Sequence, residues 1–193
     1  FTINTANTST GSSTAAQFKL PLIASFNGVT SNVDWGDGST NTITAFNQAE
    51  VTHTYASSGT YTVTISGALR GFRFGNGGDR LKILNISKWG VLEINDNAFF
   101  WGCSNLTCNA TDLPSVTAAS LNLAFGFAPL FNGDLTNLNI SLTTDLQSMF
   151  FSATSYNRSF ANFDINQVTN FSNFLSNVTI STANYDATLI SWN

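Results

Sequence analysis

Apolar and polar positions repeat in register over two consecutive 25-residue blocks, which begin at Ala124 and Met149. Aligned positions keep their class: Phe125 with Phe150, Ala128 with Ala153, Phe131 with Tyr156, Leu135 with Phe160, Leu138 with Phe163, and Ile140 with Ile165. A fixed period of this size is typical of stacked repeat units that cannot bury their apolar faces alone. The pattern therefore predicts a stack of repeats in the C-terminal part of the chain.

Within each repeat, apolar residues follow the spacing L-x-x-L-x-L, as in Leu81–Ile86, Leu135–Ile140 and Phe160–Ile165, with a degenerate copy at Ala110 and Leu113. This spacing predicts a short strand that joins a parallel sheet. In the other half of the unit, Phe125-x-x-Ala128 and Phe150-x-x-Ala153 space their apolar residues by three. That spacing predicts a single helical turn covering the sheet.

The N-terminal part, from Phe1 to about Gly67, has a different pattern, with short alternating runs separated by Gly, Ser, Asn and Asp. Such runs predict half-buried antiparallel strands, here Phe18–Leu22, Val33–Trp35 and Tyr61–Ile65. Gly36 and Gly38 permit positive φ, and Asp37 can close an Asx turn. We therefore predict a hairpin at Asp34–Thr40.

The segments Val33–Thr40, His53–Tyr55 and Gly59–Ile65 together resemble the PKD (polycystic kidney disease) family. The resemblance implies an immunoglobulin-like β-sandwich that serves outside cells as a spacer or binding module without catalytic residues.

From about Arg80 to the end, the chain resembles the BspA-like family, also called DUF285 or the Mycoplasma lipoprotein-associated repeat. The segments that carry the resemblance are Met149–Asn157, Val168–Asn173 and Leu175–Trp192. The resemblance implies leucine-rich-type repeats of bacterial or viral surface proteins that mediate adhesion or attachment, without enzymatic activity.

The expected fold is mainly β: a PKD-like β-sandwich over residues 1–70 runs into a short leucine-rich-repeat-like solenoid over residues 71–193, with parallel strands and short helical turns. The expected solenoid units lie near 80–97, 98–123, 124–148 and 149–173, with a cap at 174–193. Phe72 and Phe74 alternate with Arg73 in the connecting stretch, which predicts a strand and a fused pair of modules instead of a flexible linker.

Charge is scarce, because only 9% of the 193 residues are Asp, Glu, Lys or Arg. Seven basic residues stand against eleven acidic ones, so there is no basic patch from which to expect a nucleic-acid partner. No apolar run has the length needed to cross a bilayer, and we expect no membrane insertion.

Asp34 and Asp37 form a close pair of carboxylates in the predicted hairpin turn. The pair is a weak candidate for calcium binding, but capping of the turn is the favoured interpretation because a calcium loop supplies three or more ligands at fixed spacing. The single histidine, His53, lies on a predicted strand without a nucleophile motif. We therefore expect no catalytic residues, no metal centre, no cofactor and no enzymatic activity.

Cys103 and Cys108 lie five positions apart, which permits a local disulfide if the backbone brings them together. The alternative is that Cys103, which aligns with Ala128 and Ala153, is a small buried residue of the repeat.

Aromatic residues make up 13% of the chain, and most are expected in the core. The excess at Phe99, Phe100, Trp101, Phe125 and Phe127 has two interpretations that the sequence leaves open. These side chains either belong to the interior or mark a contact surface for a partner.

Two functions remain. The first is a non-enzymatic extracellular surface protein that acts in adhesion or attachment through protein or glycan contacts, for example on a host. The second is a structural subunit of a virion surface, as a capsid decoration or tail appendage, or of an extracellular filament. In that case the partners are other copies of itself or other surface or virion proteins.

Overall fold

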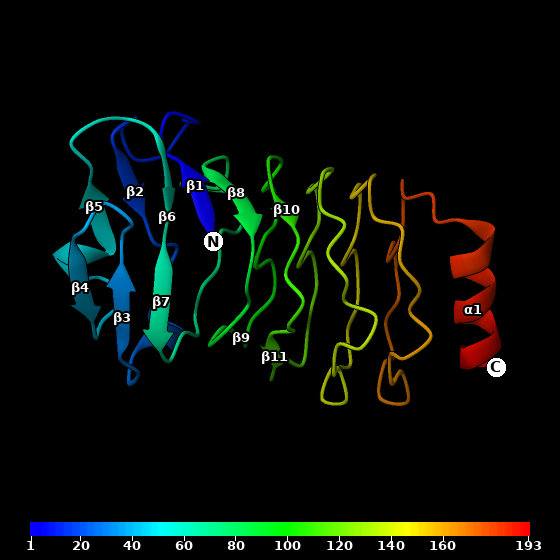
Figure 1. Cartoon of the computed structure of the whole chain (residues 1–193). Helices are drawn as coiled ribbons and strands as arrows, with labels where there is room; N and C mark the ends of the chain where they lie inside the picture. The colour runs from blue at the N-terminus through cyan, green and yellow to red at the C-terminus, as the bar shows by residue number, and fades with distance from the viewer.

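A computed structural model describes all residues 1–193. The protein is mainly β, with several small sheets and one C-terminal helix. Strands gather at the N-terminal end, coils of chain follow side by side, and helix α1 (Thr182–Trp192) lies at the opposite end (Figure 1). The strands are β1 (Thr2–Asn4), β2 (Gln17–Lys19), β3 (Ser31–Asp34), β4 (Thr40–Ile43), β5 (Thr52–Thr54), β6 (Thr60–Thr62), β7 (Thr64–Gly67), β8 (Ile83–Ile86), β9 (Glu93–Ile94), β10 (Thr107–Cys108) and β11 (Ser115–Val116), with short 3-10 helices η1 (Ala24–Phe26) and η2 (Ala49–Val51).

The predicted hairpin is confirmed. Strands β3 and β4 pair antiparallel with Asp34 opposite Thr40, and β7 pairs with the other edge of β3. Gly36 in the turn has φ +82°, and a Cβ there would lie 2.4 Å from the carbonyl oxygen of Thr62. The tight turn therefore requires glycine at this position.

The predicted strand Tyr61–Ile65 is two strands that belong to different sheets. Strand β6 pairs with β1, whereas β7 pairs with β3. The chain changes sheets at Val63, which is fully buried between them. The predicted run Phe18–Leu22 supplies β2, which pairs with β5.

The two parts of the chain share one sheet and one core. The order of the largest sheet is β10-β8-β1-β6, so β1 of the N-terminal part pairs directly with β8 of the repeats. A single cluster of 41 buried apolar residues extends through both parts. The strand predicted around Phe72 is reduced to one bridge with Leu22.

A buried ion pair holds the junction. The side chains of Asp79 and Lys82 are both 0% exposed, with 3.5 Å between Nζ and Oδ1. Lys82 Nζ also donates to Ser13 Oγ and to the carbonyl oxygens of Ser13, Thr14 and Gln17, at 2.7–3.0 Å. Asp79 accepts from the backbone N–H of Ser13 and of Lys19, each at 2.7 Å. Both charges are thus compensated, and a loop of the N-terminal part is tied to the first repeat.

The predicted register of the repeats is confirmed by their aromatic columns. Phe125 stacks on Phe150 with ring centroids 5.4 Å apart and planes at 9°. Phe131 stacks on Tyr156 at 6.1 Å and 4°. Residues 25 positions apart therefore lie directly over one another in neighbouring repeats.

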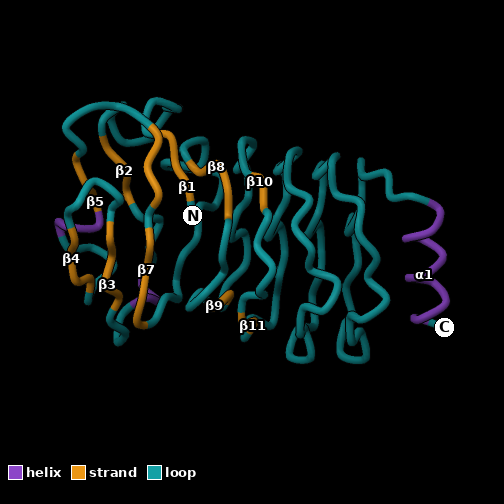
Figure 2. Tube along the Cα trace, in the orientation of Figure 1, coloured by secondary structure: helices purple, strands orange, loops and turns teal.

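Parallel strands are fewer than predicted. They form only between β8 and β10 and between β9 and β11. Further along, single parallel bridges link Ser120 to Asp145 and Asp145 to Asn170, and the chain is drawn there as loop (Figure 2).

The predicted strands at Leu138–Ile140 and Phe163–Ile165 are wrong for a local reason. The N–H of Leu138 donates to the carbonyl of Leu135, which closes a turn inside the L-x-x-L spacing. The side chain of Asn139 then accepts from the N–H of Ser141. Such local bonds compete with the bonds of a sheet.

The predicted helical turn at Phe125-x-x-Ala128 is also wrong. This part of each repeat is a series of tight turns that contain residues in the left-handed conformation. Two sets of residues have positive φ at 25-residue spacing: Ala98, Leu123, Ser148 and Asn173, and Gly102, Phe127, Ser152 and Asn177. Between these two positions of a repeat, every second backbone N–H donates to a backbone carbonyl of the next repeat, as from Leu123 to Gln147, Phe125 to Met149 and Phe127 to Phe151. We call this arrangement the turn ladder.

Helix α1 covers the last repeat. It begins after Ser181, whose side chain accepts from the N–H of Asn184. On its inner side Thr188 is buried, and Trp192 Nε1 donates to the carbonyl of Phe160 at 3.0 Å. The helix has 11 residues, and no helix in the structure is both long and apolar enough to pass through a membrane.

Candidate functional site

Asp34 and Asp37 both act within the hairpin turn. Asp34 Oδ1 accepts from the N–H of Gly36 at 2.9 Å, and Asp37 Oδ1 accepts from the N–H of Ser39 at 3.0 Å. No group of three or more His, Cys, Asp or Glu side chains is placed to hold a metal ion. The positions of both carboxylates fit turn capping.

His53 lies beside this turn, an arrangement that the sequence did not indicate. Its Nε2 is 2.8 Å from Asp37 Oδ2, and its ring stacks on Trp35 with centroids 4.7 Å apart. Partial burial alone would raise the pKa of Asp37, but hydrogen bonds from Ser39 and His53 outweigh it and lower the pKa to about 2.

Ser39, His53 and Asp37 do not form a catalytic triad. Ser39 Oγ, at 3.4 Å, and Asp37 approach the same nitrogen, Nε2 of His53. A triad needs them on opposite ring nitrogens, so that the carboxylate orients the imidazole while the serine loses its proton to it. The cluster therefore serves to fix the turn.

The two cysteines are free thiols, so the disulfide interpretation is wrong. Cys103 is fully buried, as are Ala128 and Ala153 at the aligned positions. Cys108 occupies another column, where its Sγ would lie 2.9 Å from a Cβ added at Gly133. Burial raises the pKa of both thiols, which disfavours the reactive thiolate.

The five aromatic candidates divide into two groups. Phe99, Phe100 and Phe125 are at most 1% exposed, so the contact interpretation is wrong for them, because their rings fill the interior columns. Trp101 is half-buried. Phe127 is 46% exposed and lies against Phe151, with ring centroids 5.1 Å apart.

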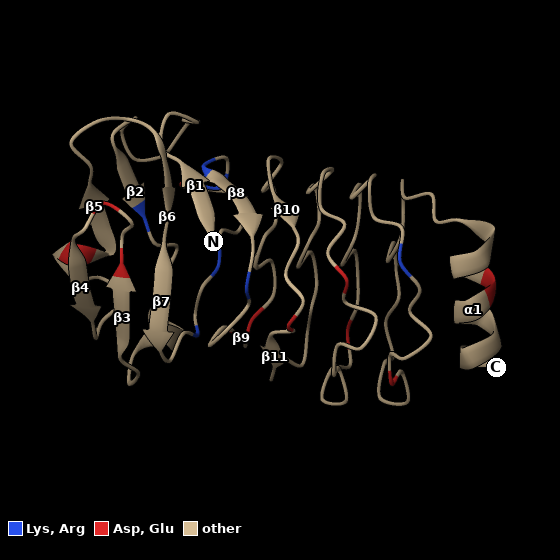
Figure 3. Cartoon of the chain, in the orientation of Figure 1, with Lys and Arg blue, Asp and Glu red and all other residues tan.

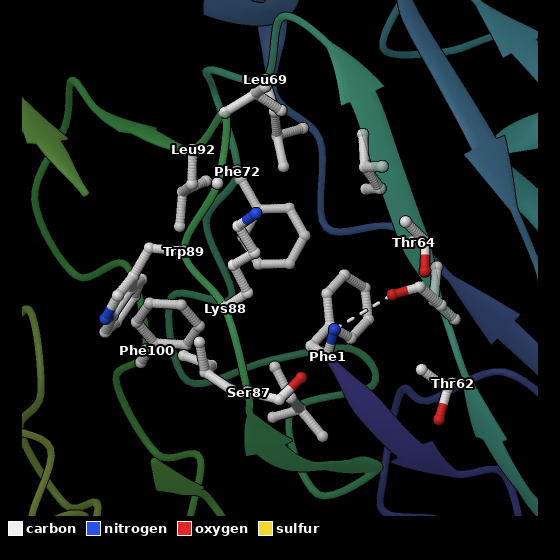
Figure 4. A pocket seen from close by; sticks show the side chains of 16 residues that line it. Phe1, Thr62, Thr64, Leu69, Phe72, Ser87, Lys88, Trp89, Leu92 and Phe100 are labelled. Carbon is white, nitrogen blue, oxygen red and sulfur yellow. Dashed lines mark hydrogen bonds between the residues drawn. The ribbon is translucent and has the colours of Figure 1, made fainter. Parts of the chain in front are cut away.

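An apolar cavity of about 200 Å³ lies at the junction of the two parts. Trp89 and Leu92 lie on one side of it, Thr62 and Thr64 on the other, and the ring of Phe1 between them (Figure 4). The amino group of Phe1 donates to the carbonyl of Val63 at 3.0 Å. Burial lowers the pKa of this amino group.

The junction cavity is a weak candidate for function. Its volume is below the range of about 300–1,000 Å³ that is usual for ligand pockets. Apart from the amino group of Phe1, its lining contains one ionisable group, Lys88, and no carboxylate, thiol or imidazole. The cavity can accept a small apolar group, but it lacks the pair of groups that acid–base chemistry needs.

A second hollow, which we call the Phe127 groove, runs across four consecutive turns of the repeat stack. It has a volume of about 470 Å³ and is lined by Asn76, Arg80, Leu81, Gly102, Ser104, Phe127, Pro129 and Ser152. This volume lies within the usual range for ligand pockets. One aromatic ring, the side chain of Arg80 and several short polar side chains thus line one open groove.

The sequence indicated Phe127 but missed its partners in the groove. Asn76 lies in the Gly-rich connecting stretch and Arg80 at the start of the first expected repeat, and neither was predicted as a site residue. The missed signal was the 25-residue register, which places Gly102, Phe127 and Ser152 in one column. Charged side chains are sparse along the repeats (Figure 3).

Comparison with known proteins agrees with this division of the chain. Residues 1–70 match the model of the PKD domain, and residues 73–188 match that of the Mycoplasma protein of unknown function, DUF285. The chain belongs to the DUF285 family and carries a PKD domain before the DUF285 region, which confirms both resemblances. Both domains are typical of surface-type proteins. No curated protein and no solved structure matches the chain.

Proposed function

We propose that the protein is a non-enzymatic extracellular surface protein that acts in adhesion or attachment, through contacts with protein or glycan. In this proposal, a PKD-like β-sandwich is continued by a leucine-rich-type solenoid, which together present one elongated contact surface. The observation that carries the proposal is the exposed ring of Phe127 in the Phe127 groove. An exposed aromatic side chain in a hollow of suitable size favours contact with a partner.

The chemistry of the groove also supports binding without turnover. Its lining has no carboxylate, imidazole or thiol, so no group there is suited to take a proton near neutral pH. Contact therefore fits the groove better than catalysis.

The test is adhesion of beads that carry the full chain to panels of immobilised glycans and extracellular-matrix proteins. We expect retention on at least one surface and its loss for beads that carry Phe127→Gly. Leu142→Ala is the control, because it removes another exposed apolar side chain, which is 61% exposed and lies outside the groove. Failure of the wild-type beads to adhere to any surface, or equal losses in both variants, would contradict the proposal.

A second candidate function is a structural subunit, assembled from many copies on a virion surface or in an extracellular filament. The outer side of α1 favours it, because Tyr185, Leu189 and Ile190 are 51%, 48% and 79% exposed on the helix that covers the last repeat. Exposed ends of repeat stacks favour association unless they are capped by polar residues. Sedimentation velocity tests this idea: we expect concentration-dependent assembly that Ile190→Asp abolishes, and a wild-type protein that stays monomeric would exclude it.

A further inference from the structure

Phe127 occupies a position that suits glycine. In the column formed by Gly102, Phe127, Ser152 and Asn177, all four residues have positive φ, between 54° and 78°. Glycine and asparagine adopt this conformation readily, whereas a bulky side chain costs about 1–2 kcal/mol there. Phe127 therefore carries a backbone cost that its neighbours in the column reduce or avoid.

The ring of Phe127 also gains less from burial than a core ring does, because it is 46% exposed to water. It touches Phe151 of the next repeat but lies outside the interior columns, where Phe125 fills the core position of the same repeat. The backbone conformation therefore favours glycine at residue 127, and the exposed half of the ring adds nothing to stability. Local strain that the fold does not need often marks a functional position.

The opposite wall of the groove is polar. A Cβ at Gly102 would lie 2.1 Å from Asn76 Oδ1 and 3.0 Å from Arg80 Cδ, so these two side chains lie directly over the glycine. The lack of a side chain at Gly102 therefore lets the amide of Asn76 and the stem of Arg80 line the groove beside Phe127.

Arg80 has no carboxylate partner in the structure. The ion pairs are His53–Asp37, Arg73–Asp96 and Lys82–Asp79, and the one side-chain hydrogen bond of Arg80 is a long one, from Nη1 to Ser9 Oγ at 3.3 Å. A guanidinium has five N–H donors in a planar fork that matches a carboxylate. Its other N–H donors make no hydrogen bond within the protein.

We propose that the Phe127 groove binds a pyranose sugar that bears a carboxylate, such as a sialic acid or a uronic acid. A sugar ring has an apolar face that can stack on Phe127 and a hydroxyl rim that suits Asn76, Ser104 and Ser152. Arg80 pairs with the carboxylate. A peptide fits the groove less well, because the groove has a single aromatic ring and no deep apolar pocket for an anchor side chain. This inference rests on the proposed attachment function and names its ligand class.

The test is titration calorimetry of the full chain with two probes, sialyllactose and a hyaluronan tetrasaccharide, and with lactose as the neutral control. We expect one of the two acidic sugars to bind at least about tenfold more tightly than lactose, which corresponds to about 1.4 kcal/mol. Which of them binds distinguishes a sialic acid from a uronic acid. Phe127→Gly and Arg80→Gln should each weaken binding by about tenfold or more, whereas Leu142→Ala should leave it unchanged.

Thermal melting separates lost binding from lost folding, because in Phe127→Gly relief of the left-handed backbone offsets the lost contact with Phe151, and the variant should melt close to the wild-type temperature. Equal binding of lactose and of the acidic sugars would overturn the carboxylate contact. If neither acidic sugar binds but beads still adhere to a protein surface through Phe127, the sugar proposal fails and the attachment function stands. If the beads adhere to nothing, both fail.

Discussion

The N-terminal part and the repeats of this protein satisfy their backbone groups in different ways. In the N-terminal part, strands such as β3 pair with neighbours on both edges, in an antiparallel sheet. In the repeats from Ala98 onwards, the turn ladder replaces most strand pairing, and left-handed residues recur every 25 positions. Buried N–H groups must find partners in either case. The comparison teaches that a regular stack can form without regular strands, provided that every repeat makes the same turns.

The largest expected effect concerns the joint between the two parts. Replacing Lys82 by Met removes one member of the buried pair and leaves Asp79 charged and 0% exposed. Loss of one partner of a buried ion pair destabilises a protein by about 3–5 kcal/mol. We expect urea unfolding monitored by circular dichroism to show a loss of stability of this size.

Arg73→Met is the matched control for this change. The Arg73–Asp96 pair also lies near the joint, but its side chains are 35% and 30% exposed and its closest atoms are 3.6 Å apart. Partly exposed pairs contribute about 0–1 kcal/mol. A similar loss in both variants would mean that burial does not set the strength of the joint.

The joint between the two parts could not be predicted from the sequence. The apolar spacing predicted the aromatic columns, and its contrast with the hairpin pattern around Asp37 predicted the two-part organisation. Both features depend on patterns that are local in the sequence. Asp79 and Lys82 lie within or next to a Gly-rich turn, and only the folded chain brings Ser13 to them. A bond between residues so far apart in sequence leaves no local pattern.

The turn ladder was missed for a related reason. Ala98, Leu123 and Ser148 have positive φ although their side chains do not favour it, so nothing in their identity predicted the turns. Neighbouring repeats impose this conformation through hydrogen bonds such as that from Ser148 to Ser172. The Phe127 groove depends on the same turns, and only its aromatic member could be predicted from the sequence.

A smaller effect concerns the response of the N-terminal part to acid. The pKa of Asp37 is lowered from 3.8 to about 2 in the folded protein. The folded state therefore favours the carboxylate more than the unfolded chain does. The resulting stability is complete above about pH 4 and is lost as the pH falls from about 4 to about 2.

Asp37→Asn tests this response in the N-terminal part. We expect the variant to be less stable than the wild type at neutral pH, in urea titrations, and the difference to shrink at about pH 2–3. Asp37 is exposed, so solvent screening keeps the effect small. A difference that stays constant over this range would show that the carboxylate acts through its shape and not through its charge.

The smallest expected effect compares the two parts most directly. Replacing serine by glycine should raise the free energy of unfolding in one part and lower it in the other. Ser148 has φ +53° in the turn ladder, and glycine there relieves a left-handed conformation while keeping the N–H that donates to Ser172. Ser66 lies exposed in β7, opposite Asn32 of β3, in an extended strand where glycine adds only flexibility to the unfolded chain. We expect Ser148→Gly to stabilise the protein by about 0.5–1 kcal/mol, and Ser66→Gly to destabilise it by a similar amount. Denaturant midpoints of the two variants, measured side by side, check the difference. If both substitutions destabilise the protein, the left-handed turns carry no strain that glycine can relieve, and the argument for Phe127 from backbone strain fails with them.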